Sequence, residues 1–346
     1  MLQTLELTNF RSYSSGLFGF EPGVNIIVGA NASGKTNLLE AIHTICTLGG
    51  FKALDKDLVR NTEEWCRLEA LTDAGTRVVK IKQHVSKDIE LDGVKKKRLS
   101  AHTSLPVVVF EPEHMLLLSS DPDRRRNYVD GMLSLTRPGY KSLLQDYKRS
   151  VSQRNRLLKN EQLDTNQLFI WDVQLAEKAG LLVEQRSSLI TTLNNTTRDI
   201  YKELSNSKEV LSLSYKSKLN LKNYADNLLE YLKEHIELDR MRGFTTAGPH
   251  RDDLEIELKG GDAKVLASRG ETRTIILSLK IAELKLIEEL TGKSPILLLD
   301  DVFSELDGSR RRALAEALTN YQTFLTTTDA DVAVDHFSAY NIIPIS

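Results

Sequence analysis

Hydrophobic positions in the first 120 residues mainly follow the period of strands. Leu5 and Leu7 alternate with polar residues, and Val24–Val28 is a short apolar run that stops at a glycine, as a buried strand does. Residues 37–48 instead carry apolar side chains at helical spacing. Asp92-Gly93 is typical of a hairpin turn. Further β-like runs are expected at 77–85, 87–91 and 107–110.

The pattern becomes helical near residue 121. From there to about residue 240 the sequence is rich in Leu, Lys and Glu, and Pro138-Gly139 is its one clear break. We predict several antiparallel helices in this stretch. No heptad pattern is sustained, which argues against a long coiled-coil arm.

Strand-like alternation returns after Gly243. Residues 254–258 alternate, Gly260-Gly261 is expected to turn the chain, and Val265-Leu266 is expected to begin the return strand. A helix, a buried strand and a second helix should follow, at 272–290, 296–299 and 310–318.

The shifts from a strand-like to a helical pattern and back predict two domains, and a length of 346 residues is sufficient for two. We expect 1–120 to form the first part of one lobe, 121–240 to form a helical lobe, and 241–346 to complete the first lobe. The two β-rich ends must then fold together around the helical insert.

Composition narrows the class of protein. A net charge of -2 argues against a uniformly basic protein that coats DNA. The two cysteines form no CxxC pair, so a zinc ribbon or a disulfide framework is not expected. The sequence has no basic-then-apolar leader and no apolar run of about 18 residues. We therefore expect a soluble cytoplasmic protein without a membrane link.

The strand at 24–28 leads into a phosphate-binding motif, which a helical segment follows at once. Glycines let backbone N–H groups turn toward phosphate oxygens, and the helix start adds the positive end of its dipole. Lys35 would place a charge on the outer phosphates, and the Thr36 hydroxyl would ligate Mg²⁺. The motif reads Gly29-Ala30-Asn31-Ala32-Ser33-Gly34-Lys35-Thr36.

Two aspartates follow the buried strand at 296–299. P-loop enzymes hold Mg²⁺ from its second side with a carboxylate at a strand end. Asp300 is the natural magnesium partner, and Asp301 would orient the attacking water. The carboxylate of Asp300 is more than 260 residues from the phosphate loop. That distance argues against small GTPases and simple kinases, and favours an ATPase core split by an insertion.

A third element, Ser268-Arg269-Gly270-Glu271, opens the helix that precedes this strand. A Ser and a Gly at a helix start form an anion site, here one that would serve the γ-phosphate of a second subunit. An ordinary helix cap at Ser268 is the alternative interpretation.

Together these elements resemble the ABC ATPase head of SMC-type proteins and, within that group, the RecF family. The resemblance covers almost the whole chain, and Gly248-Pro249-His250-Arg251-Asp252-Asp253-Leu254 is highly characteristic of the family. It implies an α/β fold: an ABC-type P-loop ATPase head with a mixed central sheet, an antiparallel β subdomain and an inserted helical lobe. The role of His250 and Arg251, in binding or in a buried structural pair, stays open.

The same resemblance implies an activity. ATP would join two heads, each nucleotide lying between Lys35 of one subunit and Ser268 of the other. The closed dimer would bind DNA, slow hydrolysis would open it, and RecR, RecO and RecA would be partners in repair at gapped DNA. One departure matters: the usual signature is Ser-x-Gly-Gln, and Glu271 adds a negative charge unless Arg269 or Arg273 offsets it.

A basic stretch from Arg124 to Lys159 is the main candidate for DNA contacts. It holds ten Lys or Arg and two Asp, and a solvated charged face is its alternative interpretation. Lys95-Lys96-Lys97-Arg98 is a second candidate. We expect backbone contacts to duplex or gapped DNA with little sequence preference. The candidate residues are Arg124, Arg125, Arg126, Lys148, Arg149, Arg154 and Arg156.

Three other functions share parts of this pattern. A structural SMC-like head would need long coiled-coil arms, an ABC-fused nuclease would need an added acidic metal cluster, and a transporter ATPase would carry a switch histidine. The position directly after Leu325-Thr326-Thr327-Thr328 carries no histidine. The sequence favours an ATP-gated DNA-binding protein of recombinational repair.

Overall fold

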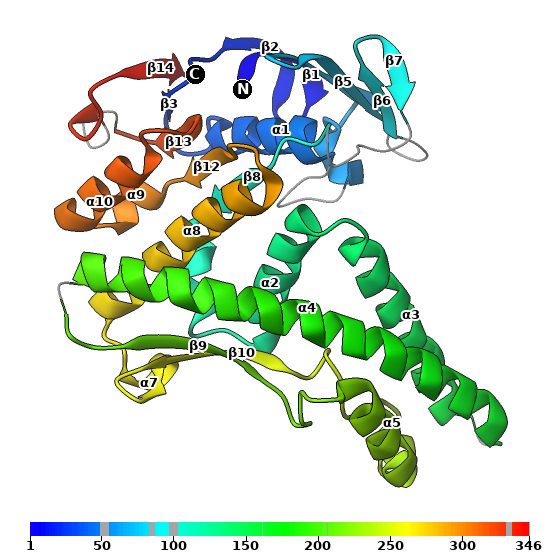
Figure 1. Ribbon diagram of the computed structural model, residues 1–346. Helices are drawn as coiled ribbons and strands as arrows, with labels where there is room; N and C mark the ends of the chain where they lie inside the picture. Colours follow the sequence, from blue (N-terminus) through cyan, green and yellow to red (C-terminus); the bar gives the residue numbers. More distant parts are fainter. Residues whose placement is uncertain are drawn as a thin grey trace. The chain divides into compact units, whose positions relative to one another are not determined.

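The computed structural model describes residues 1–48, 55–82, 87–96, 103–160, 162–205, 207–329 and 334–345. The chain forms two compact units (Figure 1). Unit 1 consists of Met1–Met115 and Ile287–Ser346, and unit 2 of Leu116–Leu286. Both ends of the chain therefore build unit 1, as the sequence predicts.

Unit 1 contains two sheets. The antiparallel sheet has the order β2-β1-β4-β5-β6-β7, and the second sheet has the order β14-β3-β13-β12-β8, with parallel pairing at each described neighbour. The antiparallel strands are β1 (Leu2–Phe10), β2 (Tyr13–Gly19), β4 (Trp65–Thr72), β5 (Gly75–Lys82), β6 (Lys87–Leu91) and β7 (Val94–Lys96). The parallel strands are β3 (Val24–Val28), β8 (Val107–Phe110), β12 (Ile296–Asp300), β13 (Thr323–Thr327) and β14 (Tyr340–Pro344).

Helix α1 (Lys35–Thr47) packs on strands of both sheets. Leu38, Leu39 and Ile42 are fully buried in the cluster that forms the core of unit 1, since the helix is apolar on two faces. The helix that carries the phosphate loop is thus held from both sides. The other helices of unit 1 are η1 (Asp55–Leu58), α9 (Val302–Glu305) and α10 (Gly308–Leu318).

Unit 2 combines helices with a three-stranded antiparallel sheet of order β11-β10-β9. Its strands are β9 (Leu211–Lys216), β10 (Asp253–Leu258) and β11 (Gly261–Asp262). Its helices are α2 (Pro122–Thr136), α3 (Tyr140–Leu158), α4 (Thr165–Ser205), α5 (Tyr224–Glu234), α6 (Ile236–Arg242) and α7 (Ala263–Leu266). Two further elements cross the unit boundaries in the chain: η2 (Pro112–Leu117) and α8 (Arg269–Thr291).

Several local predictions are confirmed. Asp92 and Gly93 form the β6–β7 turn, both with positive φ, and Pro138-Gly139 separates α2 from α3. The predicted α/β fold class is confirmed as well, since unit 1 contains a parallel and an antiparallel sheet and unit 2 is inserted into its sequence. The central sheet was expected to be mixed, and this detail is wrong, because each described pair of its strands is parallel.

Other predictions need correction. The stretch 121–240 is not wholly helical: β9 lies inside it and pairs with β10, so unit 2 continues to Leu286 and does not end at 240. Val265-Leu266 belongs to helix α7, because the Asp262 carboxylate accepts a hydrogen bond from the Lys264 N–H and starts a helix there. The turn residues between β10 and β11 are Lys259 and Gly260.

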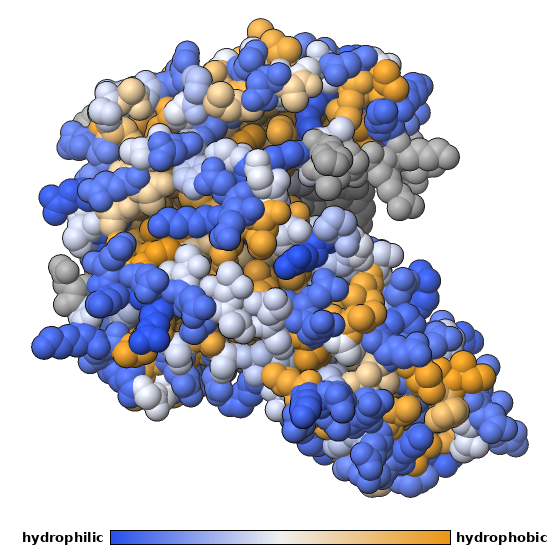
Figure 2. Space-filling model, viewed as in Figure 1, coloured by the Kyte–Doolittle hydropathy of each residue, from blue (hydrophilic) through white to orange (hydrophobic). Residues whose placement is uncertain are grey.

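The exposed surface is mixed. Figure 2 shows hydrophilic side chains over most of the face in view, with apolar side chains gathered in smaller areas. In the described part of the chain, no helix has the length and apolar character that crossing a bilayer requires.

Candidate nucleotide site

The phosphate loop, Gly29–Thr36, joins β3 to α1. Ala32 and Gly34 have φ values of 65° and 105°, a left-handed backbone that turns successive N–H groups to one side. A Cβ on Gly29 would lie 2.5 Å from both the Ile345 carbonyl oxygen and Ser33 Oγ, so only glycine fits there. Lys35 Nζ donates to the carbonyls of Gly29 and Ala30, at 2.7 and 2.8 Å, and so lies across the loop.

The loop meets the acidic strand end. Thr36 Oγ1 donates to Asp300 Oδ1 at 2.9 Å, although 264 residues separate them in the chain. Thr326 Oγ1, from the neighbouring strand β13, donates to the same Asp300 oxygen at 3.0 Å. The Asp300 residue is only 6% exposed, so these two hydroxyls fix the orientation of its carboxylate. Asp301, the next residue, is exposed and has a φ of 53°.

Both elements line one cavity of about 580 Å³. It lies at the carboxyl ends of β3, β13, β12 and β8, the edge where parallel α/β sheets bind ligands. Its lining includes most of the predicted loop and both aspartates: Asn31, Ala32, Gly34, Lys35, Thr36, Asp300 and Asp301.

Sequence reasoning gave no site role to three other residues of this cavity, Glu111, Glu113 and Thr326. Glu111 directly follows the apolar run 107–110, and Thr326 lies near the end of β13. Their position directly after or near the end of apolar runs was a usable signal, because the carboxyl ends of adjacent parallel strands share one edge of a sheet. The sequence did not show which strands are adjacent.

The β1–β2 turn braces the loop from the antiparallel sheet. The Tyr13 hydroxyl donates to the Gly34 carbonyl at 3.1 Å. Arg11 donates to Glu40 of α1 through Nε and Nη2, at 2.8 and 2.6 Å, and the Glu40 side chain is 1% exposed. This buried ion pair fixes the turn to the helix that carries the loop.

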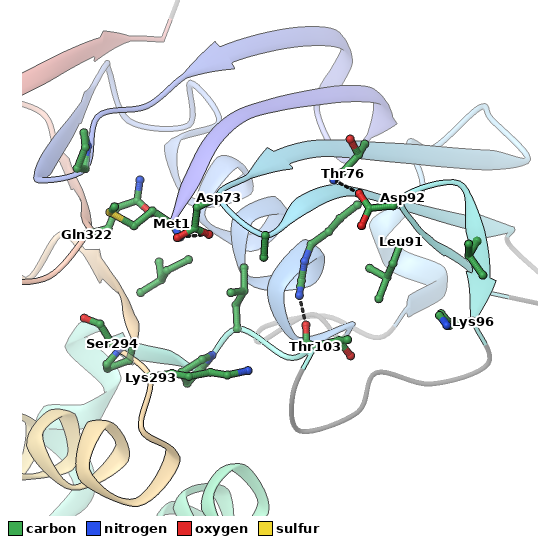
Figure 3. A pocket seen from close by; sticks show the side chains of 18 of the residues that line it. Met1, Asp73, Thr76, Leu91, Asp92, Lys96, Thr103, Lys293, Ser294 and Gln322 are labelled. Atoms are coloured by element: carbon green, nitrogen blue, oxygen red, sulfur yellow. Dashed lines mark hydrogen bonds and ion pairs between the residues drawn. The ribbon is translucent and has the colours of Figure 1, made fainter.

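A second cavity of unit 1, of about 830 Å³, lies beside the start of β8 and β12 (Figure 3). Arg77 on its wall donates to the Ile45, Cys46 and Thr103 carbonyls. Two of these belong to the last turn of α1, so Arg77 stabilises the carboxyl end of that helix. None of the motif residues lines this larger cavity, so the candidate site is the smaller one.

The element Ser268–Glu271 lies in unit 2, at the start of α8. The Ser268 Oγ accepts the Glu271 N–H at 3.3 Å, and Glu271 Oε2 accepts the Ser268 N–H at 2.8 Å. This reciprocal pair is a capping box. Lys259 Nζ donates to Glu271 Oε1 at 2.7 Å, and its charge with the capping contacts lowers the pKa of Glu271 to about 2. Lys259 thus offsets the charge of Glu271, a role for which sequence reasoning named only Arg269 and Arg273 as candidates.

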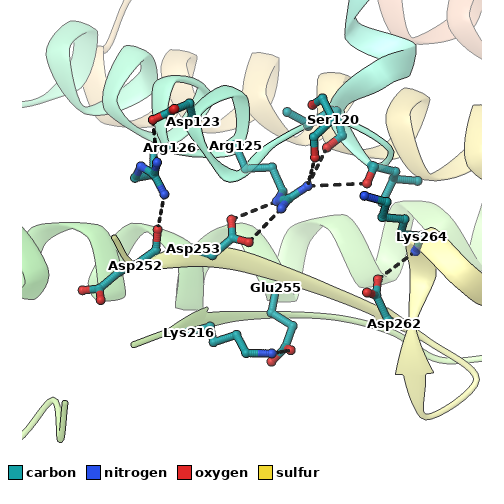
Figure 4. Close-up of polar contacts among 12 residues, drawn as sticks. Ser120, Asp123, Arg125, Arg126, Lys216, Asp252, Asp253, Glu255, Asp262 and Lys264 are labelled. Carbon is teal, nitrogen blue, oxygen red and sulfur yellow. Dashed lines mark hydrogen bonds and ion pairs between the residues drawn. The ribbon is translucent and has the colours of Figure 1, made fainter. Parts of the chain in front are cut away.

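The basic stretch divides into structural and exposed residues. Arg125 donates to both carboxylate oxygens of Asp253, and Arg126 donates to Asp123 and to the Asp252 carbonyl (Figure 4). These contacts hold α2 against the start of β10. Bonded in this way, neither guanidinium is well placed for DNA.

The prediction of Arg154 as a DNA contact is wrong. Its side chain is 0% exposed and donates to Asp172 and Asp239, at 2.5 Å each, and to Thr245 Oγ1 at 3.1 Å. Burial raises the pKa of Asp172, and the charge of Arg154 partly opposes this rise. Arg154 therefore joins α3, α4 and α6 inside unit 2, where no DNA phosphate reaches it.

Lys148, Arg149 and Arg156 are exposed, whereas Arg124 is half-buried. The spacing of these three and two further exposed lysines puts five cations on one side of α3. This surface, called the basic face of α3 below, consists of Lys141, Lys148, Arg149, Arg156 and Lys159. In the second candidate stretch, Lys95 and Lys96 are exposed on β7, and Lys97 and Arg98 lie outside the described residues.

The characteristic segment 248–254 organises the interior of unit 2. His250 Nδ1 lies 2.6 Å from the Tyr147 hydroxyl, and Nε2 lies 3.2 Å from the Thr245 carbonyl. Burial lowers the pKa of His250 to about 4. Asp252 accepts hydrogen bonds from three hydroxyls, those of Tyr215, Tyr224 and Ser217. The segment therefore has a structural role, and the open question about His250 is answered in favour of a buried contact.

The parallel sheet of unit 1 is built from two distant parts of the chain, and it brings a phosphate loop and an acidic strand end to one cavity. This arrangement defines a P-loop ATPase head of the ABC type. The model of the RecF/RecN/SMC N-terminal domain family matches residues 1–342. The DNA replication and repair protein RecF of Staphylococcus aureus is 34% identical over 97% of this chain and 95% of its own length. The chain belongs to the RecF family, and it is an ABC-type ATPase.

Solved structures agree with this assignment. A structure of the recombination mediator protein RecF-ATP in the RecFOR pathway has a TM-score of 0.86 and 32% identity, over 95% of this chain and 92% of that one. An Smc head domain from Pyrococcus furiosus reaches a TM-score of 0.54 at 16% identity, over 100% and 94% of the two chains. This more distant likeness shows the shared head fold alone.

Proposed function

We propose that the chain is an ATP-dependent DNA-binding protein of recombinational repair and replication-fork maintenance, whose head dimer forms on ATP and opens on slow hydrolysis. The contact between Thr36 and Asp300 carries the proposal, because it brings the two halves of a nucleotide site together at one cavity. Relatives named for DNA replication and repair, and a RecF-ATP structure, support the same function.

ATP is the proposed ligand of this cavity. Its phosphates would lie in the loop Gly29–Thr36, with Lys35 on the outer phosphates. Two of the ammonium's three donors already bond to loop carbonyls, so an entering phosphate would receive the third and compete for the others.

Mg²⁺ fits the same end of the cavity. It prefers oxygen ligands, and it takes one or two protein groups beside the phosphates of a nucleotide. The Thr36 hydroxyl and the Asp300 carboxylate provide such oxygens. When bound, the ion would offset the charge of the phosphates. Asp301, exposed at the cavity, would orient the attacking water.

The proposed dimer completes each site with the amino end of the partner's α8, through Ser268, Arg269, Gly270 and Glu271. The N–H groups and dipole of a helix start suit a γ-phosphate. Closure on ATP, and release after hydrolysis, would couple nucleotide state to DNA binding.

DNA would bind through phosphate contacts at the basic face of α3. Five exposed cations on one helix side, with few acids between them, suit a backbone contact that does not depend on sequence. Through the family resemblance we include RecR, RecO and RecA as partners in a cytoplasmic repair reaction at gapped DNA. The alternative, a structural SMC-like head, receives less support, because the match to Smc heads is 16% identical against 34% for RecF.

Sedimentation with ATP and Mg²⁺ tests the dimer directly. The wild type should shift toward a dimer, and Asp301→Asn should accumulate as an ATP-bound dimer, since it closes but hydrolyses slowly. Duplex and gapped DNA should stimulate hydrolysis by the wild type, and retention on DNA should fall steeply with NaCl. An Asp301→Asn protein that stays monomeric with ATP contradicts the proposed dimer, and a flat salt dependence contradicts the phosphate contacts.

A further inference from the structure

The start of α8 combines two features that oppose each other. A helix amino end attracts anions, but Glu271 places a carboxylate within its first turn. The usual signature has a neutral glutamine at this position, and a carboxylate near a nucleotide phosphate repels it. Glu271 also keeps the helix start in shape, because its Oε2 accepts the Ser268 N–H.

Lys259 resolves this conflict. Its ammonium donates to Oε1 of Glu271, the oxygen that the capping box leaves over, at 2.7 Å. The same ammonium lies 3.3 Å from Glu209 Oε2, ahead of β9. Lys259 thus joins the β10–β11 turn to the start of α8 and offsets the charge of Glu271.

Lys259 is the first of the two residues that turn the chain between β10 and β11. Its φ of 59° is the left-handed backbone that such a two-residue turn requires. The side chains of Lys259 and Glu271 are 37% and 28% exposed, and ion pairs this exposed contribute little to stability. The effect of Lys259 on the charge of Glu271 is therefore a larger part of its role than its contribution to stability.

We propose that Lys259 is a positioning residue of the ATP-driven dimer, which neutralises Glu271 so that the start of α8 can receive the phosphates of the partner's nucleotide. This inference rests on the proposed function. It also explains how a chain with glutamate at the signature position keeps an anion site there.

A charge cycle tests the inference. Lys259→Gln should weaken the dimer formed on a slowly hydrolysed ATP analogue about tenfold, measured as the dimer Kd by sedimentation, because Glu271 keeps its charge without an offset. Glu271→Gln should dimerise as well as or better than the wild type, since glutamine also forms a capping box. Adding Lys259→Gln to Glu271→Gln should then change the Kd less than about twofold, a coupling that an independent structural role would not give.

Lys216→Gln is the matched control. Lys216 forms an exposed ion pair with Glu255 at the other end of the β9–β10 pair, so its loss changes the net charge equally without touching α8. It should leave the dimer Kd unchanged, and all variants should keep the wild-type melting temperature within a few degrees.

The outcomes separate the two hypotheses. If the wild type stays monomeric with the analogue, the proposed function fails. If the wild type dimerises and Lys259→Gln dimerises equally well, or weakens the dimer equally in both Glu271 backgrounds, the role of Lys259 is overturned while the dimer stands.

Discussion

Arg154 in unit 2 and Lys35 in unit 1 are both basic residues with little exposure, at 0% and 9%, yet their surroundings differ. Two carboxylates from its own unit hold Arg154. Lys35 bonds to two neutral loop carbonyls and borders an open cavity. A buried cation that its own fold neutralises stabilises the fold, whereas one beside neutral dipoles at a cavity can bind an anion.

The aspartates of the two units repeat this contrast. Asp252 accepts three hydroxyl hydrogen bonds inside unit 2, in a segment that also carries the charged residues Arg251 and Asp253. Asp300 accepts two threonine hydroxyls and still borders the nucleotide cavity. Charge in a motif therefore does not by itself distinguish a binding residue from a structural one. The hydrogen-bond partners of the residue and its access to a cavity make that distinction.

The largest expected effect is on the stability of unit 2. Arg154→Met leaves Asp172 and Asp239 buried without their cation, and breaking such a pair costs about 3–5 kcal/mol. Urea unfolding followed by Trp171 fluorescence, in a Trp65→Phe background, measures the loss. Arg149→Met, on the exposed side of the same helix, should change stability by less than about 0.5 kcal/mol. Equal effects of the two substitutions would remove the contrast.

The next effect is on binding in unit 1. A charge-assisted contact contributes on the order of 3 kcal/mol, so Lys35→Ala should weaken ATP binding about 100-fold or more. Titration calorimetry with ATP and Mg²⁺ checks this. The Arg154→Met protein, at urea-free conditions where it stays folded, should bind ATP normally. An Lys35→Ala protein with unchanged affinity would falsify the site.

The smallest expected effect sharpens the role of His250. Its pKa in the folded chain is lowered to about 4, so between the unfolded value of 6.5 and about 4 only the unfolded chain binds this proton. The contribution to stability is therefore lost as the pH falls through that window. From pH 7.5 to 5 we expect a loss of about 1–2 kcal/mol. His250→Gln should reduce this slope in urea titrations, and an unaltered slope would contradict the buried neutral ring.

The sequence identified the loop and the aspartates that meet at the candidate nucleotide cavity, because their signals are local. The loop needs particular residues at fixed spacing, and a buried strand that ends in Asp300 needs only a short apolar run. Sequence reasoning missed Thr326 and Glu111, because their position at the cavity depends on which strands are neighbours in the sheet. That order follows from long-range packing.

Unit 2 was harder for a related reason. Strand β9 lies within a Leu- and Lys-rich region, and only its pairing with β10, far along the chain, makes it a strand. Arg154 belongs to the stretch of cations that we treated as one basic surface. The two carboxylates that bind it, Asp172 and Asp239, come from helices distant in the sequence. Charge counted along a sequence does not reveal which side chains fold inward.

The position of β3 in its sheet has a consequence for how the protein is made. This strand lies between β13 and β14, whose residues follow those of unit 2 in the chain. The phosphate loop is translated before unit 2, but its supporting strand gains these two neighbours only after unit 2 has been made. The nucleotide pocket is thus completed after unit 2, and the interval leaves an apolar strand with unpaired edges, which invite aggregation.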